Sequence, residues 1–333
     1  MTGRRESSAW ILVALAPVVF LAALLVGRFG IRFTDTFRAL LGLGGVEDVF
    51  RALVLQVRLP RVLAAACIGA NLAASGAAFQ GLFRNPLVDS RILGVSSGAA
   101  FGAAVALLAS AGWLGVQVSA FAFALVAVGI VCTIGSRLGS SPLVLVIGGV
   151  LVSALFNALL GLTKYVADPL STLPAITYWL LGGLSTARWA SIIPLLAVTV
   201  LGVTFLVAVR WRLNVLTLSD AEATAMGVRV RGFRWAVILV GTVLVAASVA
   251  VGGMIGWIGL VVPHLARAWV GPDHGRMIPV SIAVGAIILM VLDSVARSAM
   301  ASEIPLGILT GLIGVPAFFL LFVRFLSQRE STR

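Results

Sequence analysis

Few residues in this 333-residue chain could carry out chemistry. Its only lysine, Lys164, is followed by Tyr165, whereas a phosphate-binding loop needs GxxxxGK followed by serine or threonine. The chain therefore cannot hydrolyse ATP by that route. His264 and His274 have no carboxylate at ligand spacing, so structural histidines are expected rather than a zinc ligand or a general base. We predict no catalytic residue, no metal site and no cofactor on this chain.

Asp293 is the acidic residue placed well inside an apolar run. Arg297 follows one helical turn later, and a pair at this spacing would neutralise both charges. A carboxylate at mid-membrane could instead couple transport to protons or sodium. We expect a structural ion pair and keep an ion-coupled secondary transporter as the alternative.

The composition indicates the solvent around these residues. Hydrophobic residues make up 60% of the chain and charged residues 11%, with a mean hydropathy of +1.12. Soluble domains carry about 25% charged residues. The apolar runs lack the alternation of a membrane β-barrel. We therefore predict an all-α integral membrane protein.

Charges, turn residues and Pro/Gly clusters divide the chain into about ten spans of roughly 20 residues each. We predict one transmembrane domain, residues 1–333, with spans near 9–28, 52–81, 93–109, 113–136, 142–166, 191–209, 233–252, 257–270, 277–298 and 304–325. An even number of spans places both termini on one side of the membrane.

Arginine dominates the 24 basic residues, which outnumber 12 acidic ones. The arginines cluster at the ends of apolar runs, which indicates topology and contact with lipid headgroups rather than nucleic acid. With ten spans, 15 of the 24 basic residues share the side of the termini, which is therefore predicted to be cytoplasmic. The first outward loop is an exception that favours an acidic partner there, because it is rich in arginine: Arg28, Arg32, Arg38, Arg51, Arg58 and Arg61.

Two segments are too polar or too broken to span. Residues 167–189 are predicted to dip in from the outside as a re-entrant segment. Residues 213–232 are predicted to lie on the cytoplasmic surface as a short amphipathic helix. Ser219 and Glu222 would form its capping box, and Gly227 would end it.

Several motifs, taken together, resemble a known family. They are RLPR at 58–61, NPL at 85–87, LGVSSGA at 93–99, GLVVPHLAR at 259–267 and EIPLGILTGLIGVPAFFLL at 303–321. In the same order, they resemble the type II permeases of ATP-binding cassette (ABC) importers for iron chelates, haem and cobalamin. The resemblance implies a homodimer in the bacterial inner membrane with its pathway at the two-fold axis. It also implies two cytoplasmic ATPase subunits, which bind ATP and Mg²⁺, and an external substrate-binding protein.

The resemblance also implies roles for particular residues. The positions that would receive acidic residues of the binding protein are Arg58, Arg61 and Arg297. The loops that would form the cytoplasmic gate contain Asn85, Leu87, Ser140 and Ser141. The positions that would contact the ATPase are Asp220, Ala223, Met226 and Gly227.

Candidate pathway residues are polar side chains of the fifth predicted span and the re-entrant segment, although polar side chains on a helix can also simply bond backbone carbonyls. They are Ser153, Asn157, Thr163 and Tyr178. A ferric siderophore is the expected substrate, followed by haem and cobalamin, with an oxyanion such as molybdate as an alternative within the family.

Overall fold

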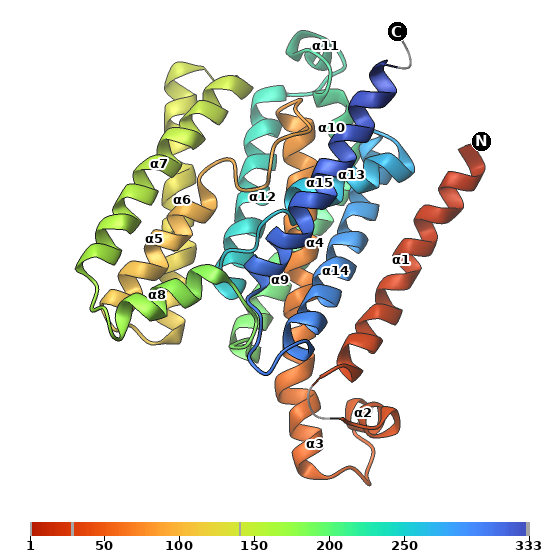
Figure 1. Cartoon of the computed structure of the whole chain (residues 1–333). Coiled ribbons are helices and arrows are strands. Elements are labelled where there is room, and N and C mark those ends of the chain that lie inside the picture. Colours follow the sequence, from red (N-terminus) through yellow and green to blue (C-terminus); the bar gives the residue numbers. More distant parts are fainter. Residues whose placement is uncertain (1, 28–29, 140, 331–333) are drawn as a thin grey trace.

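The computed structural model describes residues 2–27, 30–139 and 141–330, and every regular element within those residues is a helix. The bundle helices are α1 (Thr2–Leu25), α4 (Leu59–Leu82), α5 (Val95–Leu108), α6 (Trp113–Leu138), α7 (Pro142–Val166), α9 (Trp189–Ala208), α12 (Val230–Gly252), α13 (Ile258–Val270), α14 (His274–Ser298) and α15 (Leu306–Glu330). The shorter elements are α2 (Phe33–Leu40), α3 (Asp48–Ala52), the π-helical turn η1 (Leu53–Arg58), α8 (Thr172–Leu181), α10 (Arg210–Leu216) and α11 (Asp220–Ala225). Both chain ends lie at the same end of the bundle as α11 (Figure 1).

The predicted all-helical membrane fold is confirmed. Each predicted span coincides with a helix, and within the described residues six helices are long and apolar enough to cross a membrane. By contrast, α5 has 14 residues and α13 has 13. At 1.5 Å per residue these two measure about 20 Å, less than a hydrocarbon core of about 30 Å. They would cross it only together with the non-helical segments that precede them.

Helix α4 is the central element, and nearly all of its side chains are buried. It packs against α14, α12, α13 and α9. Gly69 faces the backbone of Gly285, and Gly76 faces the backbone of Gly259, so closely that an added Cβ would meet a carbonyl oxygen. Small residues therefore set the distance between these helices, as is common where lipid provides no hydrophobic drive between spans.

The outer part of α4 continues through η1 into α3 as one helix, Asp48–Leu82. Pro60 lies just after the π-helical turn. Because proline lacks an N–H and its ring crowds the carbonyl four residues earlier, the wider turn accommodates it without breaking the helix. The helix thus carries both Arg58 and Arg61 past the outer ends of α1 and α14.

The polar segment 213–232 contains two short helices, α10 and α11, rather than the single helix predicted. The predicted capping box is present: the Glu222 N–H donates to the Ser219 hydroxyl over 3.2 Å, and the Ser219 N–H donates to the Glu222 carboxylate over 2.8 Å. Gly227 has a φ of +79°, which makes it the stop expected after this helix.

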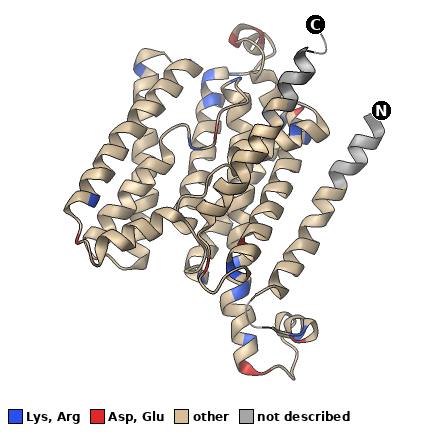
Figure 2. Ribbon diagram, viewed as in Figure 1, with Lys and Arg blue, Asp and Glu red and all other residues tan. Residues whose placement is uncertain are grey.

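Charged residues lie mainly toward the two ends of the bundle, and the middle is largely uncharged (Figure 2). This distribution is what a membrane-spanning bundle requires, because a charge at the bilayer centre is costly.

Candidate functional site

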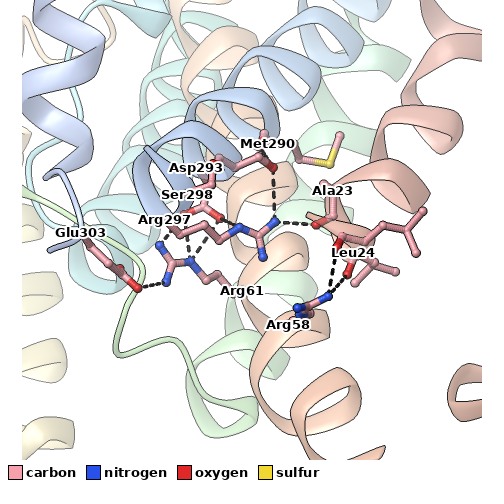
Figure 3. A network of polar contacts seen from close by, with 11 residues as sticks. Ala23, Leu24, Arg58, Arg61, Met290, Asp293, Arg297, Ser298 and Glu303 are labelled. Atoms are coloured by element: carbon pink, nitrogen blue, oxygen red, sulfur yellow. Dashed lines mark hydrogen bonds and ion pairs between the residues drawn. The ribbon is translucent and has the colours of Figure 1, made fainter. Parts of the chain in front are cut away.

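A buried ionic network joins α4, α14 and the segment before α15 near the end of the bundle opposite the termini (Figure 3). The Arg61 Nε donates to the two Asp293 carboxylate oxygens over 2.9 and 3.1 Å. The Arg61 Nη1 donates to Glu303 over 2.9 Å. Arg61 therefore joins one fully buried carboxylate to one that is partly exposed.

Two further arginines of this network bind the end of α1. The last carbonyls of a helix have no partner within it, and they attract cations. The Arg58 Nη1 donates to the carbonyls of Leu24 and Leu25 over 2.9 and 3.1 Å. The Arg297 Nη2 donates to the carbonyl of Ala23 over 2.5 Å. These bonds explain how basic side chains can be buried at the outer end of α1.

The predicted ion pair between Asp293 and Arg297 is confirmed, with Nε and carboxylate oxygen 3.6 Å apart. The stronger partner of Asp293 is Arg61, at 2.9 Å, which the sequence reasoning missed because the two are 232 residues apart. Glu303 was missed as well, although it opens the EIPLG motif that carried part of the family resemblance.

The fold brings together the three arginines that are predicted to receive a docking partner, but it buries their side chains instead of exposing them at the surface. Arg58, Arg61 and Arg297 are only 4%, 7% and 6% exposed. Three guanidinium groups face two carboxylates in this network, so it keeps an excess of positive charge. Exposed arginines of this end include Arg32, Arg38 and Arg51, on or beside α2 and α3, and Arg188, which directly precedes α9.

At the other end of α4, the chain turns through a Schellman motif that places Arg84 where glycine is usual. The Arg84 N–H donates to the Gly81 carbonyl, and the Asn85 N–H donates to the Gln80 carbonyl. Arg84 has a φ of +51°. A left-handed conformation costs an L-residue about 1–2 kcal/mol, which the surrounding structure has to offset.

The predicted gate residues Asn85 and Leu87 follow this turn directly. The Asn85 carboxamide oxygen accepts the Leu87 N–H over 2.9 Å, which is the local turn bond that asparagine commonly makes before proline. Leu87 is 52% exposed. Ser141 caps α7 by accepting the Val144 N–H over 3.3 Å, and Ser140 lies outside the described residues.

Arg84 binds Asp220, the first residue of α11. Its Nη2 donates to Asp220 Oδ1 over 2.6 Å, and its Nε donates to the Leu216 carbonyl over 2.9 Å. From the first turns of α12, the Arg234 Nη2 donates to both Asp220 oxygens over 3.1 Å. Partial burial opposes ionisation, but the bonds from Arg234 and Arg84 outweigh it and hold the pKa of the Asp220 carboxyl below its usual range. We refer to Asp220, Arg84 and Arg234 as the Asp220 cluster.

A cavity of about 980 Å³ opens beside this cluster. Residues from the gate and coupling predictions, Ser141, Asp220 and Gly227, line it together with Arg84 and Arg234. The fold thus brings the turn between α6 and α7 next to the segment between α11 and α12, which sequence alone had treated as separate sites.

The predicted coupling residues differ in how the fold presents them. Ala223 is fully buried, whereas Met226 is 60% exposed. Ala223 was expected to face a partner, and the structure places it instead against the protein's own core, because it is on the inward face of a short helix. Met226 and the exposed Leu218 are the apolar side chains that this segment offers.

The candidate pathway residues differ in their burial and in their contacts. Thr163 is buried, and its hydroxyl donates to the Leu159 carbonyl over 2.9 Å, so it serves its own helix. Ser153 lies beside Gly94, and Asn157 is exposed on α7. Tyr178 is 58% exposed and lines a second cavity of about 280 Å³ between α6, α8 and the end of α12.

Comparison with known proteins gives consistent matches over nearly the whole chain. A model described as the FecCD transport family matches residues 15–324. The molybdate import system permease protein MolB of Haemophilus influenzae is 41% identical, over 82% of this chain and 81% of that protein. The cobalamin import system permease protein BtuC of Halobacterium salinarum is 43% identical, over 84% and 75%. The hemin transport system permease protein HmuU of Yersinia pestis is 36% identical, over 96% of each.

A solved structure described as an inward-facing conformation of a metal-chelate type ABC transporter has the same fold. It matches with a TM-score of 0.86 and 37% identity, over 96% of this chain and 99% of that one. The helices and loops described above are therefore those of a known transport architecture.

Proposed function

Because the chain belongs to the FecCD transport family, we propose that it is the membrane-spanning permease of a binding-protein-dependent ABC importer that carries a metal chelate across a bacterial inner membrane. The observation that carries this proposal is the likeness over nearly the full chain to permeases named for cobalamin and haemin import. A ferric siderophore, haem or cobalamin is the substrate class that these names support.

The energy for transport comes from a partner, since the sequence has no phosphate-binding loop. Two cytoplasmic ATPase subunits, which bind ATP and Mg²⁺, would contact the segment from α10 to α12 of each of two permease copies. Its exposed large apolar residues, Trp211, Leu218 and Met226, offer a contact surface, and the neighbouring cavity of about 980 Å³ offers a recess. Both chain ends would then lie on the cytoplasmic side, with α11.

At the opposite end, an acidic binding protein would dock. The network around Arg61 has an excess of positive charge, and Arg32, Arg38 and Arg51 are exposed nearby in sequence. Arginine–carboxylate contacts are suited to docking that must be specific and reversible. Because Arg58, Arg61 and Arg297 are buried, an incoming carboxylate would first reach an exposed arginine such as Arg32, Arg38, Arg51 or Arg188.

Docking is tested by charge reversal in two groups. Arg38→Glu with Arg51→Glu should weaken association with the binding protein while the permease stays folded, as measured by surface plasmon resonance on the purified transporter. Arg58→Glu with Arg61→Glu should also weaken association, but with loss of thermal stability. Unchanged association in both double variants would overturn the proposed docking surface.

The substrate is tested by reconstitution with an ATPase and a binding protein that co-purify with this chain. ATP-dependent uptake into liposomes should be observed for one metal chelate from a panel of ferric hydroxamate, haemin and cobalamin. Molybdate belongs in the panel because MolB is 41% identical to this chain. Uptake of molybdate alone would replace the chelate by an oxyanion as the substrate.

An ion-coupled carrier is the competing mechanism, and its coupling group would be Asp293. That carboxylate is held by Arg61 and Arg297, which favours a structural ion pair over a proton relay. Uptake that requires the ATPase and persists in the presence of a protonophore supports the ABC mechanism. Uptake without ATPase that the protonophore abolishes would favour the carrier.

A further inference from the structure

The position of Arg84 raises the question of what its side chain does. The residue occupies the left-handed position of a Schellman motif, which glycine fills without strain. Its side chain is 33% exposed, and its guanidinium binds the Leu216 carbonyl at the end of α10 and the Asp220 carboxylate at the start of α11. The turn at the end of α4 is thus joined to both helices of the polar segment.

Asp220 connects three elements: its own helix α11, the turn after α4 and helix α12. Its carboxylate is shared between Arg84, which ends α4, and Arg234, whose side chain is only 5% exposed in α12. Helix α11 packs mainly against α10 and α12, and the Asp220 carboxylate gives it a polar connection to Arg84 at the end of α4. Asp220 itself is 52% exposed and accessible from the cavity.

The contact between Asp220 and Arg84 lies next to the predicted gate loop at residues 85–87. Asn85 and Leu87 follow Arg84 without a break, and their turn is fixed by the bond between the Asn85 side chain and the Leu87 N–H. A displacement of α11 that pulls on Asp220 would therefore act on the backbone of residues 84–87 through a short, charge-assisted contact.

We propose that Asp220 is a positioning residue that transmits movement of α11 to the gate loop at 85–87 through Arg84, with Arg234 as its anchor in α12. This inference rests on the proposed function, because it takes α11 as the element that an ATPase displaces. Asp220 touches neither substrate nor nucleotide in this role. It converts a rigid-body movement at the surface into a movement of the loop.

The test measures the loop directly. A spin label is attached at Leu87→Cys, in a chain whose Cys67 and Cys132 are replaced by alanine, and the transporter is reconstituted with its ATPase in nanodiscs. The distance between the labels of the two permease copies is measured by double electron–electron resonance, without nucleotide and with Mg²⁺–ATP and a hydrolysis-deficient ATPase. With Asp220 present, nucleotide should shift the distance distribution.

Asp220→Asn keeps the size of the side chain and removes the charge that Arg84 and Arg234 share. We expect nucleotide to bind the ATPase as before, while the shift of the label distance is lost. Arg84→Gln should lose the same shift, and the double variant should be no worse than either single one, since each of these variants disrupts the contact between Arg84 and Asp220. Glu222→Gln is the control for loss of a charge on α11. The Glu222 carboxylate hydrogen-bonds Ser219, and glutamine also completes a capping box. Its charge attracts Arg84 only through space, whereas Asp220 binds Arg84 directly.

The outcomes separate the inference from the proposed function. A normal shift in Asp220→Asn, with Arg84→Gln also normal, would overturn the role of Asp220. A lost shift in the Glu222→Gln control would assign the effect to α11 as a whole and would also overturn it. If no ATPase co-purifies with the unsubstituted chain, the proposed function is wrong. If the ATPase binds but nucleotide never changes the distance between the labels in the unsubstituted chain, the assignment of Leu87 to the gate is wrong.

Discussion

At the residue scale, two clusters of charged side chains lie at opposite ends of α4. The outer one joins Arg61, Asp293 and Glu303, and the inner one joins Arg84, Asp220 and Arg234. The difference between them is solvent exposure: Asp293 is fully buried, whereas the side chain of Asp220 is 52% exposed. Removing one partner of a buried ion pair strongly destabilises a protein, because the other charge stays buried without compensation. An exposed ion pair contributes little to the free energy of folding.

Asp293→Asn is expected to destabilise the protein by about 3–5 kcal/mol, because it leaves two buried arginines without their shared carboxylate. The measurement is the free energy of unfolding in detergent micelles. Glu303→Gln is the control: its carboxylate is 31% exposed, so about 1 kcal/mol or less should be lost. Equal losses in the two variants would contradict the assignment of Asp293 as the centre of the network.

Titration of the Asp220 carboxyl makes the stability of the folded protein depend on pH, and stability should fall as the pH becomes acidic. Its pKa in the folded protein is lowered, so its contribution to stability is fully present above the usual range of an aspartate and is lost as pH falls through the folded value. The difference in melting temperature between the wild type and Asp220→Asn should stay constant at neutral and mildly acidic pH. It should shrink only below the usual range of an aspartate. A difference that already disappears between pH 7 and 5 would contradict this.

At the element scale, contacts between glycines set how the spans pack around α4. Gly69 approaches the Gly285 carbonyl of α14, and Gly76 approaches the Gly259 carbonyl of α13. Hydropathy identifies these helices as spans but does not pair them, because every span is apolar. Most glycines in such segments could equally be placed toward lipid.

Gly69→Ala should therefore destabilise the protein, by about 1–3 kcal/mol for an overpacked contact, because the new methyl group meets backbone that cannot turn aside. Thermal unfolding of the purified permease measures the effect. Gly129→Ala in α6 is the matched control: nothing lies within 4 Å of the new methyl group, so this variant should be neutral or slightly stabilised. If the Gly69→Ala protein is as stable as the control, α4 and α14 can move apart without loss of folding free energy, and the close contact between them is not required.

At the scale of the whole molecule, the single chain exposes side chains that a lipid environment does not suit. Asn157 is exposed on α7, and a side-chain amide in hydrocarbon is costly unless it is hydrogen-bonded. Leu155, two residues earlier, is 52% exposed on another face of the same helix. We expect Asn157 to face water and Leu155 to face lipid.

In the transporter without native cysteines, Asn157→Cys should react with a membrane-impermeant thiosulfonate reagent much faster than Leu155→Cys. Mass spectrometry of the labelled protein in liposomes measures both rates. Because both positions are exposed in the isolated chain, only the surrounding medium should distinguish them. Equal, slow reaction at both would place the α7 face around Asn157 against lipid or a dry interface.

The amino-acid sequence by itself determined the membrane-spanning helices, the capping box at Ser219 and Glu222, and the pair of Asp293 with Arg297, because each depends on residues within a few turns of one another. The family motifs were readable for the same reason. Only the tertiary structure decided that Arg61 binds Asp293, that Arg58 and Arg297 bind the end of α1 instead of reaching outward, and that Arg84 meets Asp220. These contacts join residues that are far apart in the chain. In a sequence where nearly every segment is apolar, local pattern carries no signal for which helices pack together or which charges meet between them.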